Sequence, residues 1–460
     1  MKSRYIYLLI KIVLASLLPV SPLEARTWYI LPDGNGDAPT IQAGIDSAVS
    51  GDIVEVACGL YWEHDLELKS GIILRGETGK AECVALDLAG NGRGFRCDEV
   101  DDVTIEGFTV QNGITTYGAG VLCLFSTLTV RHCVFSDGYA IGDGAITANF
   151  STIEITDCDF LRNASFNEGA GAIYCWETNA MISGCKFMDN VAEDDGGGMW
   201  IINGSVSLTD CLFVSNHALG QYYEASGGAL MFFGQQQSSH LISNCTFYGN
   251  IGDNTIHVDE GEELAIENTI IAFNQGSSLF VYNEVAPGLT CCDIYGNIGG
   301  DWVDLIQDQF GVQGNIAEDP QFCDVASGNC ALMSSSPCAE ENNLECGQIG
   351  ALPVGCIVDA IGEETTPNGP VAFFRIHPNP FNPQTTISFS VDRTRHVVIS
   401  VYDMKGLRVA VLADQIFRAG MHEAEWNGSD SSGQPVASGT YVVRLETDGV
   451  VRLQKISLLR

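Results

Sequence analysis

The sequence is poor in positive charge. Its 460 residues contain 22 Lys and Arg against 58 Asp and Glu, which gives a formal net charge of −36. The deficit is concentrated in residues 101–360, with 34 acidic and three basic side chains, whereas residues 371–460 hold ten basic and eight acidic ones. A surface this negative repels phosphate backbones and polyuronates. We therefore expect no nucleic-acid partner, and we expect divalent cations to be attracted.

Long apolar segments are missing after the first 25 residues. The opening, MKSRYIYLLIKIVLASLLPVSPLEA, has Lys2 and Arg4, then an apolar stretch, then a cleavage site after Ala25. The apolar run is too short for a comfortable membrane span. We interpret residues 1–25 as a signal peptide, expect no transmembrane helix in the mature chain, and predict a secreted or cell-surface protein. The 17 cysteines suit an oxidising compartment.

Signatures of the common enzyme classes are also missing. The sequence has no Walker loop, no HExxH motif and no nucleophile elbow. The adjacent carboxylates Asp101 and Asp102 fall in an acidic loop, where solvated charge is the usual interpretation. The histidines His64, His217 and His257 are scattered, and we interpret them as structural or solvent-facing. We therefore predict no catalytic residues and no cofactor-binding residues.

The sequence does contain a repeat of about 25 residues. A cysteine is followed two residues later by an apolar side chain and five residues later by an asparagine, as in ITDCDFLRN at 155–163. The cysteines in this frame are Cys133, Cys158, Cys185, Cys211 and Cys245, and Gly107, Thr269 and Cys292 occupy the slot in weaker copies. The asparagines include Asn163, Asn190, Asn216, Asn250 and Asn274, and Gly138 replaces one of them.

Short segments with period-two alternation fill the rest of each unit, separated by corners rich in Gly and Asn. This is strand periodicity, and three short strands in about 25 residues are typical of one coil of a parallel β-helix. We predict an all-β fold of about ten coils over residues 26–356. Thr40, as an N-cap, and the apolar residues after it predict a helix within 39–52 that covers the open end.

The repeated residues are expected to form ladders along the stacked coils. Asn tolerates left-handed backbone and bonds locally at corners, and stacked coils would let its amides bond to one another. The cysteines are expected to pack as small apolar side chains, because in-register thiols rarely meet disulfide torsions and one column cannot close a zinc tetrahedron.

Irregular cysteines and two acidic loops are the remaining candidate sites. Disulfides are our first interpretation, and metal binding our second, for the cysteines that follow Asp319: Cys323, Cys330, Cys338, Cys346 and Cys356. Cys291 or Cys292 is a possible partner, and Cys58, Cys83 and Cys97 form a similar group near the other end. Ca²⁺ is the only candidate cofactor, with Asp194, Asp195, Asp259 and Glu260 as possible ligands.

Two resemblances refine this organisation. The segment IQAGIDSAVSGDIVEVACGLYWE resembles the opening of pectin-lyase-like right-handed β-helix proteins, and the cysteine–phenylalanine–asparagine coils resemble repeats of bacterial surface proteins. After a linker at 357–370, residues 371–460 read as a small antiparallel sandwich. PNPFNPQTTI, VYDMKGLRV and the closing KISLLR resemble the FlgD-type Ig-like module and the type A sorting domain of type IX secretion. That resemblance implies that the outer-membrane secretion machinery is a partner.

Two functions remain open from the sequence. The first is a non-catalytic β-helix rod at the bacterial surface that serves adhesion, glycan binding or envelope structure, with polysaccharide or another surface component as partner. The second is a polysaccharide lyase or glycoside hydrolase that acts on a neutral or cationic glycan. The second predicts a groove along one coil face with carboxylates about 5–10 Å apart.

Overall fold

A computed structural model describes residues 25–167, 169–220, 226–234, 238–259, 262–282, 285–325, 328–356, 371–377, 381, 384–391, 393–403, 408–431, 433–447 and 450–458. The predicted signal peptide and linker lie outside this range, apart from Ala25. The described residues divide into two compact units. Unit 1 comprises those up to Pro320 together with Glu340–Pro353, and unit 2 comprises Gln321–Ala339 together with those from Val354 onward.

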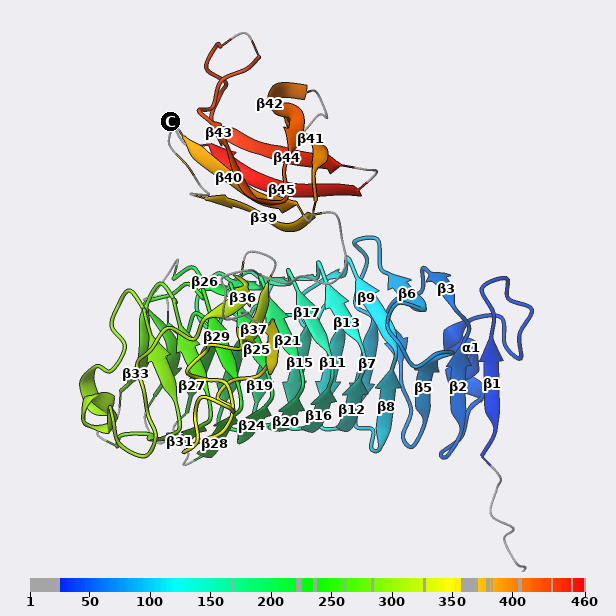
Figure 1. Ribbon diagram of the computed structural model, residues 1–460. Helices are drawn as coiled ribbons and strands as arrows, with labels where there is room; N and C mark the ends of the chain where they lie inside the picture. The colour runs from blue at the N-terminus through cyan, green and yellow to red at the C-terminus, as the bar shows by residue number, and fades with distance from the viewer. Residues whose placement is uncertain are drawn as a thin grey trace, which may run out of the picture. The chain divides into compact units, whose positions relative to one another are not determined.

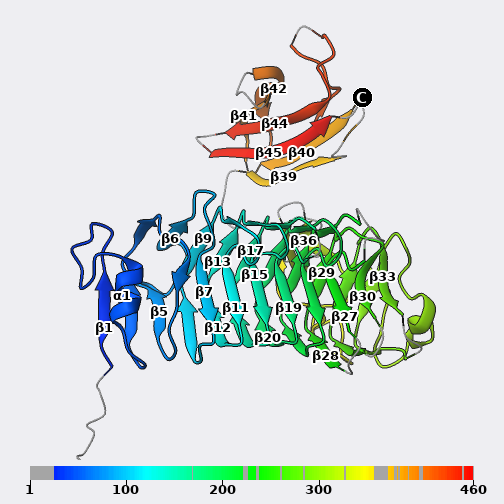
Figure 2. The ribbon, with the colours of Figure 1, turned by 180° about the vertical axis from the view of Figure 1, so that it is seen from behind.

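Unit 1 is a parallel β-helix, as the repeat predicts (Figures 1 and 2). Most coils contribute one strand to each of three long parallel sheets, which have eleven, ten and nine strands, and five coils add a two-residue strand to a fourth. Sheet A has eleven strands, so the coil count slightly exceeds the predicted ten. Its strands are β1 (Thr27–Ile30), β2 (Ile53–Val56), β5 (Ile73–Gly76), β8 (Val103–Glu106), β12 (Thr127–Arg131), β16 (Thr152–Thr156), β20 (Asn179–Ser183), β24 (Val206–Thr209), β28 (Ser238–Ser243), β31 (Glu262–Glu267) and β34 (Gly288–Thr290).

The other sheets of unit 1 follow the same stacking order. Sheet B contains β3 (Gly59–Tyr61), β6 (Val84–Asp87), β9 (Phe108–Gln111), β13 (Val134–Ser136), β17 (Asp159–Leu161), β21 (Lys186–Met188), β25 (Leu212–Val214), β29 (Thr246–Tyr248), β32 (Ile270–Ala272) and β35 (Asp293–Tyr295). Sheet C contains β4 (Leu66–Glu67), β7 (Phe95–Asp98), β11 (Val121–Leu124), β15 (Ile146–Asn149), β19 (Ile173–Trp176), β23 (Met199–Ile202), β27 (Leu230–Phe233), β30 (Asn254–Val258) and β33 (Ser277–Val281). Sheet D contains β10 (Ile114–Thr115), β14 (Tyr139–Ala140), β18 (Ala164–Ser165), β22 (Val191–Ala192) and β26 (His217–Ala218).

Two short helices accompany these sheets. Helix α1 (Ile41–Ser47) lies beside β1 at the N-terminal end of the stack (Figures 1 and 2). The Thr40 hydroxyl accepts a hydrogen bond from the Ala43 amide, and Ile41 and Ile45 are buried, so the predicted cap is present. The 3₁₀-helix η1 (Asp304–Gln309) follows the last coil. No helix within the described part of the chain is long and apolar enough to cross a membrane.

The register agrees with the repeat, apart from one copy. Phe135, Phe160, Phe187, Phe213 and Phe247 lie in one column, and consecutive rings stack with centroids 4.4–5.3 Å apart. The predicted alignment of the weak copy at Gly107 is wrong by one residue. Val134 pairs with Thr109, so the residue opposite Cys133 is Phe108 and not Gly107. Likewise, the residue opposite Phe135 is Val110. Gly107 instead occupies a corner with φ of 76°.

The asparagines form a hydrogen-bonded ladder in the interior. Each side-chain amide donates to the side-chain carbonyl of the next asparagine, at 3.1 Å from Asn163 to Asn190 and 2.9 Å from Asn190 to Asn216. The same carbonyl accepts the backbone amide of the previous asparagine. The left-handed backbone is one residue earlier than expected, at Arg162 and Asp189. The asparagines are therefore held by their side-chain hydrogen bonds, and the preceding residue turns the chain.

The repeated cysteines are buried thiols outside any disulfide. The Cys133 amide donates to the Cys158 sulfur at 3.5 Å, and the Cys158 amide donates to the Cys185 sulfur at 3.4 Å. The column continues with Cys211 and Cys245. These positions fit the packing role expected from the sequence.

Three disulfides connect irregular cysteines in the described chain. They join Cys58 to Cys83, Cys291 to Cys346, and Cys323 to Cys356. The expectation is corrected for Cys330 and Cys338, which are buried and take part in none of these three bonds. Burial raises the pKa of Cys330 to about 12, which suits a packed thiol. Cys97 is also a buried thiol, opposite Cys123 in sheet C.

Unit 2 contains one small sheet and two antiparallel sheets. The small sheet comprises β36 (Phe322–Asp324), β37 (Asn329–Met333) and β38 (Val354–Cys356). The antiparallel sheets comprise β39 (Val371–His377), β40 (Thr385–Val391) and β43 (Gly420–Trp426), and β41 (Arg395–Asp403), β42 (Arg408–Phe417), β44 (Gly439–Thr447) and β45 (Val450–Leu458). Residues of both sheets, including Phe389 and Val443, share one buried cluster.

Candidate functional site

The outer face of sheet C carries large aromatic side chains. Alternate residues of each strand face the interior, and those between them form two columns along the outside. The first column is Arg96, Leu122, Thr147, Tyr174, Trp200, Met231, His257 and Phe280. The second is Asp98, Leu124, Asn149, Trp176, Ile202 and Phe233. The inner residues therefore repeat from coil to coil, whereas the residues of the two outer columns differ from coil to coil.

Aromatic rings of neighbouring coils contact one another on this face. Phe125 and Phe150 stack with centroids 5.0 Å apart, and Phe150 lies 5.5 Å from Trp176. Tyr174 meets Trp200 edge-on at 5.9 Å. Trp176 is 41% exposed and Phe125 is 57% exposed. Grouped exposed aromatic rings mark binding surfaces more often than scattered ones do.

Two of these rings occupy strained backbone positions. Phe125 has φ of 49° and Phe150 has φ of 53°, in the left-handed region that bulky residues rarely adopt. Each such position costs on the order of 1–3 kcal/mol. Glu99 and Glu177 have the same left-handed backbone at this corner in neighbouring coils. The equivalent corner holds Asn203 in a later coil, a residue that tolerates this backbone better. Aromatic side chains are therefore present here against the local conformational preference.

A groove of about 690 Å³ crosses this face beside Trp176. Its lining combines aromatic rings, amides and carboxylates: Thr116, Tyr117, Ile141, Gly142, Asp143, Asn149, Asn167, Tyr174, Trp176 and Asp194. A second groove of about 410 Å³ is lined by Asp101, Phe125, Ser126, Thr127, Phe150, Ser151, Thr152 and Glu177. Because Phe150 contacts Trp176, the aromatic stack connects the two grooves.

Carboxyl groups with raised pKa values lie in and beside the larger groove. Burial raises the pKa of Asp143 to about 7, although the Thr147 hydroxyl, which donates to its carboxylate at 3.1 Å, opposes the shift. Burial also raises the pKa of Asp195 to about 6, against a hydrogen bond from the Ser226 amide and with help from the charges of Asp194 and Asp253. Perturbed carboxyls in a groove are typical of functional sites.

Three polar atoms in the two columns of this face have no hydrogen-bond partner among the described residues. They are the side-chain carbonyl oxygen of Asn149, the indole nitrogen of Trp200 and Nε of Arg96, and all three atoms are buried. A buried polar atom without a partner costs about 1–3 kcal/mol. Asn149 lines the larger groove, and Trp200 packs against Tyr174, which also lines it.

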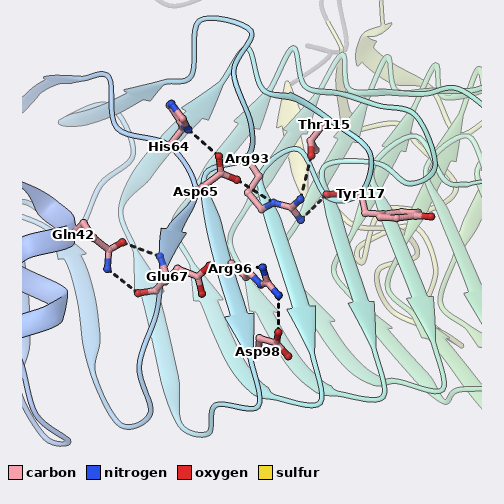
Figure 3. Close-up of polar contacts among 9 residues, drawn as sticks. All are labelled: Gln42, His64, Asp65, Glu67, Arg93, Arg96, Asp98, Thr115 and Tyr117. Atoms are coloured by element: carbon pink, nitrogen blue, oxygen red, sulfur yellow. Dashed lines mark hydrogen bonds and ion pairs between the residues drawn. The ribbon is translucent and has the colours of Figure 1, made fainter.

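A polar network occupies the N-terminal end of the same face (Figure 3). His64 contacts Asp65 at 2.8 Å, and Arg93 lies 3.4 Å from the other oxygen of Asp65. Arg93 also donates to the Tyr117 carbonyl at 3.0 Å, while Arg96 pairs with Asp98 at 2.7 Å. Burial acts to raise the pKa of Asp65, but the hydrogen bonds from His64 and Arg93 outweigh it and lower this pKa. Each arginine is neutralised locally, so the network offers no unpaired positive charge to an anion.

Within the described residues, the acidic loops are not brought together into a metal cluster. In the described residues, the one group of three potential ligands within metal-binding distance is Cys58, Glu77 and Cys83, and its two cysteines are bonded to each other. Asp194 lines the groove and Asp195 bonds to Ser226, while Asp259 is half-buried elsewhere in the β-helix. Glu260 lies outside the described residues. Calcium binding therefore stays a prediction.

The structure places the scattered histidines apart from one another. His64 belongs to the network around Asp65, and His217 is half-buried in β26. His257 lies on the outer face of sheet C beside Phe280, at 4.9 Å, and burial lowers its pKa to about 4. Sequence reasoning missed the outer-face residues, although the repeat frame placed Tyr174 and Trp200 in equivalent positions.

Family models match both units. The right-handed β-helix region matches residues 70–232, and the secretion system C-terminal sorting domain matches residues 375–458. The chain is therefore a right-handed β-helix protein with a C-terminal sorting domain of the type IX secretion system. It is an exported protein, secreted or held at the cell surface.

Solved structures with detectable similarity are distant. One is PorZ, a surface component of the type IX secretion system of Porphyromonas gingivalis, with 21% identity over 19% of this chain and 11% of that chain and a TM-score of 0.15. Another is a rhamnogalacturonan lyase, with 15% identity over 58% of this chain and 87% of that one and a TM-score of 0.37. A third is the tailspike gp49 of Acinetobacter baumannii bacteriophage Fri1, a capsular polysaccharide depolymerase, with 11% identity over 89% and 73% and a TM-score of 0.23.

The chain spans about a tenth of the length of PorZ, and these similarities are too low to carry a functional argument. No curated protein matches the chain.

Proposed function

We propose that this exported protein binds a glycan on the outer face of sheet C and serves adhesion or envelope organisation through that contact. The observation that carries the proposal is the groove of about 690 Å³, in which Tyr117, Tyr174 and Trp176 stand beside amides and carboxylates. The apolar face of a sugar ring packs on aromatic side chains, while its hydroxyls bond to amides and carboxylates. Concave sites with apolar walls and a few convergent polar groups are the usual form of ligand pockets.

The sorting domain supports the location of this activity. An exported protein meets polysaccharides of its own envelope and of its surroundings, and the apolar interior of a β-helix leaves its outer faces available for such contacts. We propose that residues 371–460 engage the outer-membrane secretion machinery, while the β-helix provides the binding face. The Ig-like character of that module remains part of the same proposal.

Binding to a panel of soluble polysaccharides, by affinity electrophoresis, tests the proposal. Trp176→Ala is expected to weaken retention by at least about tenfold, because it removes a 41% exposed ring from the groove. Tyr29→Ala is the matched control, since Tyr29 is 53% exposed on a strand of sheet A. Equal loss in both variants, or retention by neither the variants nor the parent protein, would contradict the proposal.

Hydrolysis or cleavage of the bound glycan is a second candidate, favoured by one observation. Asp143 has a pKa of about 7 inside the groove, where a carboxyl that is protonated at neutral pH is able to act as a general acid. Prolonged incubation with each retained polysaccharide, followed by detection of new reducing ends and unsaturated products, tests it. Product release that disappears in Asp143→Asn supports catalysis, and no release from any retained polysaccharide contradicts it.

A further inference from the structure

The two grooves present hydrogen-bond acceptors and aromatic rings without any basic side chain. Among the described residues that line them, none is Lys, Arg or His. The larger groove contains Asp143 and Asp194, and the smaller contains Asp101 and Glu177. Residues 101–360 as a whole carry only three basic side chains. The field at this face therefore favours a cationic ligand over an anionic one.

The aromatic rings agree with the same chemistry. Ammonium groups are attracted to the faces of Trp and Tyr rings, and the larger groove contains Tyr117, Tyr174 and Trp176. A bare metal ion fits less well, because neither Asp143 nor Asp194 belongs to a described group of three metal-ligating side chains. The volume of about 690 Å³ also suits a molecule of several rings.

We propose that the larger groove selects glycans that carry free amino groups, with the ammonium held by Asp143 and the sugar ring packed against Trp176. This inference rests on the proposed glycan-binding function and adds the ligand class. A neutral ligand would fill the groove but leave its negative charge uncompensated, and an anionic ligand would be repelled.

Calorimetric titration of the full chain with two matched probes tests the inference. The probes are an N-acetylglucosamine tetramer and the same tetramer after complete removal of its acetyl groups. We expect the amino form to bind about tenfold or more tightly at low salt, since hydrogen bonds to charged groups are roughly twice as strong as neutral ones. We expect added salt to reduce this ratio, because it screens the partly exposed charges.

Two variants locate the effect. Asp143→Asn is expected to bring the ratio of the two affinities close to one, whereas Asp210→Asn is expected to leave it unchanged. Asp210 is an exposed carboxylate at a corner between sheets A and B, so it controls for the loss of one negative charge elsewhere. If Asp143→Asn does not fold, the salt dependence of the affinity ratio in the unmodified chain decides whether the amino groups are recognised by charge in the groove.

The possible outcomes separate the two proposals. Equal affinity for both tetramers overturns the amino-glycan inference, and the proposed function survives if Trp176→Ala weakens both. Equal binding of tetralysine and the amino tetramer also overturns it, because charge alone would then explain the affinity. Binding of neither tetramer overturns the inference, and the proposed function then depends on the wider polysaccharide panel.

Discussion

At the residue scale, the interior of the β-helix depends on side chains that complete each other's hydrogen bonds. Asn216 is fully buried, and its amide group donates to the Phe187 carbonyl and to the Asn250 side chain, both at 2.9 Å. Its oxygen accepts two hydrogen bonds from Asn190. The ladder is therefore satisfied only as a continuous set, and a gap in it affects both neighbours.

Replacement of Asn216 by Ala should destabilise unit 1 by at least about 2 kcal/mol, because two buried donors and one carbonyl lose their partner. Urea unfolding followed by circular dichroism measures the loss as a lower midpoint. Asn179→Ala is the control, since Asn179 is exposed on the outer face of sheet A. A midpoint for Asn216→Ala equal to that of the control would show that the ladder contributes little.

The raised pKa of Asp143 gives a second prediction at this scale. The unfolded carboxyl loses its proton at a lower pH than the folded one, so stability falls as pH rises from about 4 through about 7. Asp143→Asn should remove this dependence and stabilise the chain at pH 8 by on the order of a few kcal/mol, with little change near pH 4. Thermal unfolding at both pH values measures it. Identical pH profiles for the two proteins would contradict the assignment.

At the element scale, two neighbouring strands of sheet A bring a hydrogen-bonded histidine–glutamate pair into the interior. His240 in β28 contacts Glu262 in β31 at 2.8 Å, and both side chains are 1% exposed. The His240 ring lies 4.2 Å from the Phe232 ring, and its second nitrogen has no hydrogen-bond partner in the described residues. The pair is costly to bury, and removal of one member leaves the other without that partner.

His240→Leu should therefore cost about 3 kcal/mol or more, and addition of Glu262→Leu should recover much of that loss. The double variant is compared with both single variants in chemical unfolding, so that the coupling between the residues is measured directly. Additive losses in the double variant would show that the two side chains do not stabilise each other.

At the element scale, the sequence alone predicts the inner residues of the coils but not the residues of the outer face. The inner residues repeat, and so the coils, the cap and the positions of Cys158 and Asn190 follow from spacing. The copy at Gly107 failed because it lacks both the cysteine and the apolar residue two positions later, where it has Thr109. The outer face of sheet C was missed, since Trp176 and Phe150 come together through the register of separate coils and do not repeat. The pairing of Cys291 with Cys346 likewise depends on how the last segment returns to the β-helix.

At the scale of the whole molecule, the two units have separate hydrophobic cores. The β-helix has its own core, helix cap and two disulfides, and the residues of the sorting domain have a separate buried cluster. Deletion of residues 371–460 should therefore leave the β-helix folded but prevent its passage to the surface. Proteolysis of intact cells that possess the type IX system, compared with cell lysates, measures this. Surface exposure of the truncated chain would contradict the sorting role.

The location of the bound glycan tests the central claim most directly. A crystal structure of the full chain with the oligosaccharide that binds most tightly is the required measurement. Our account predicts sugar density on the outer face of sheet C, packed against Trp176 and Tyr174 and within hydrogen-bond distance of Asp143. Density confined to sheet A, sheet B or unit 2 would contradict it.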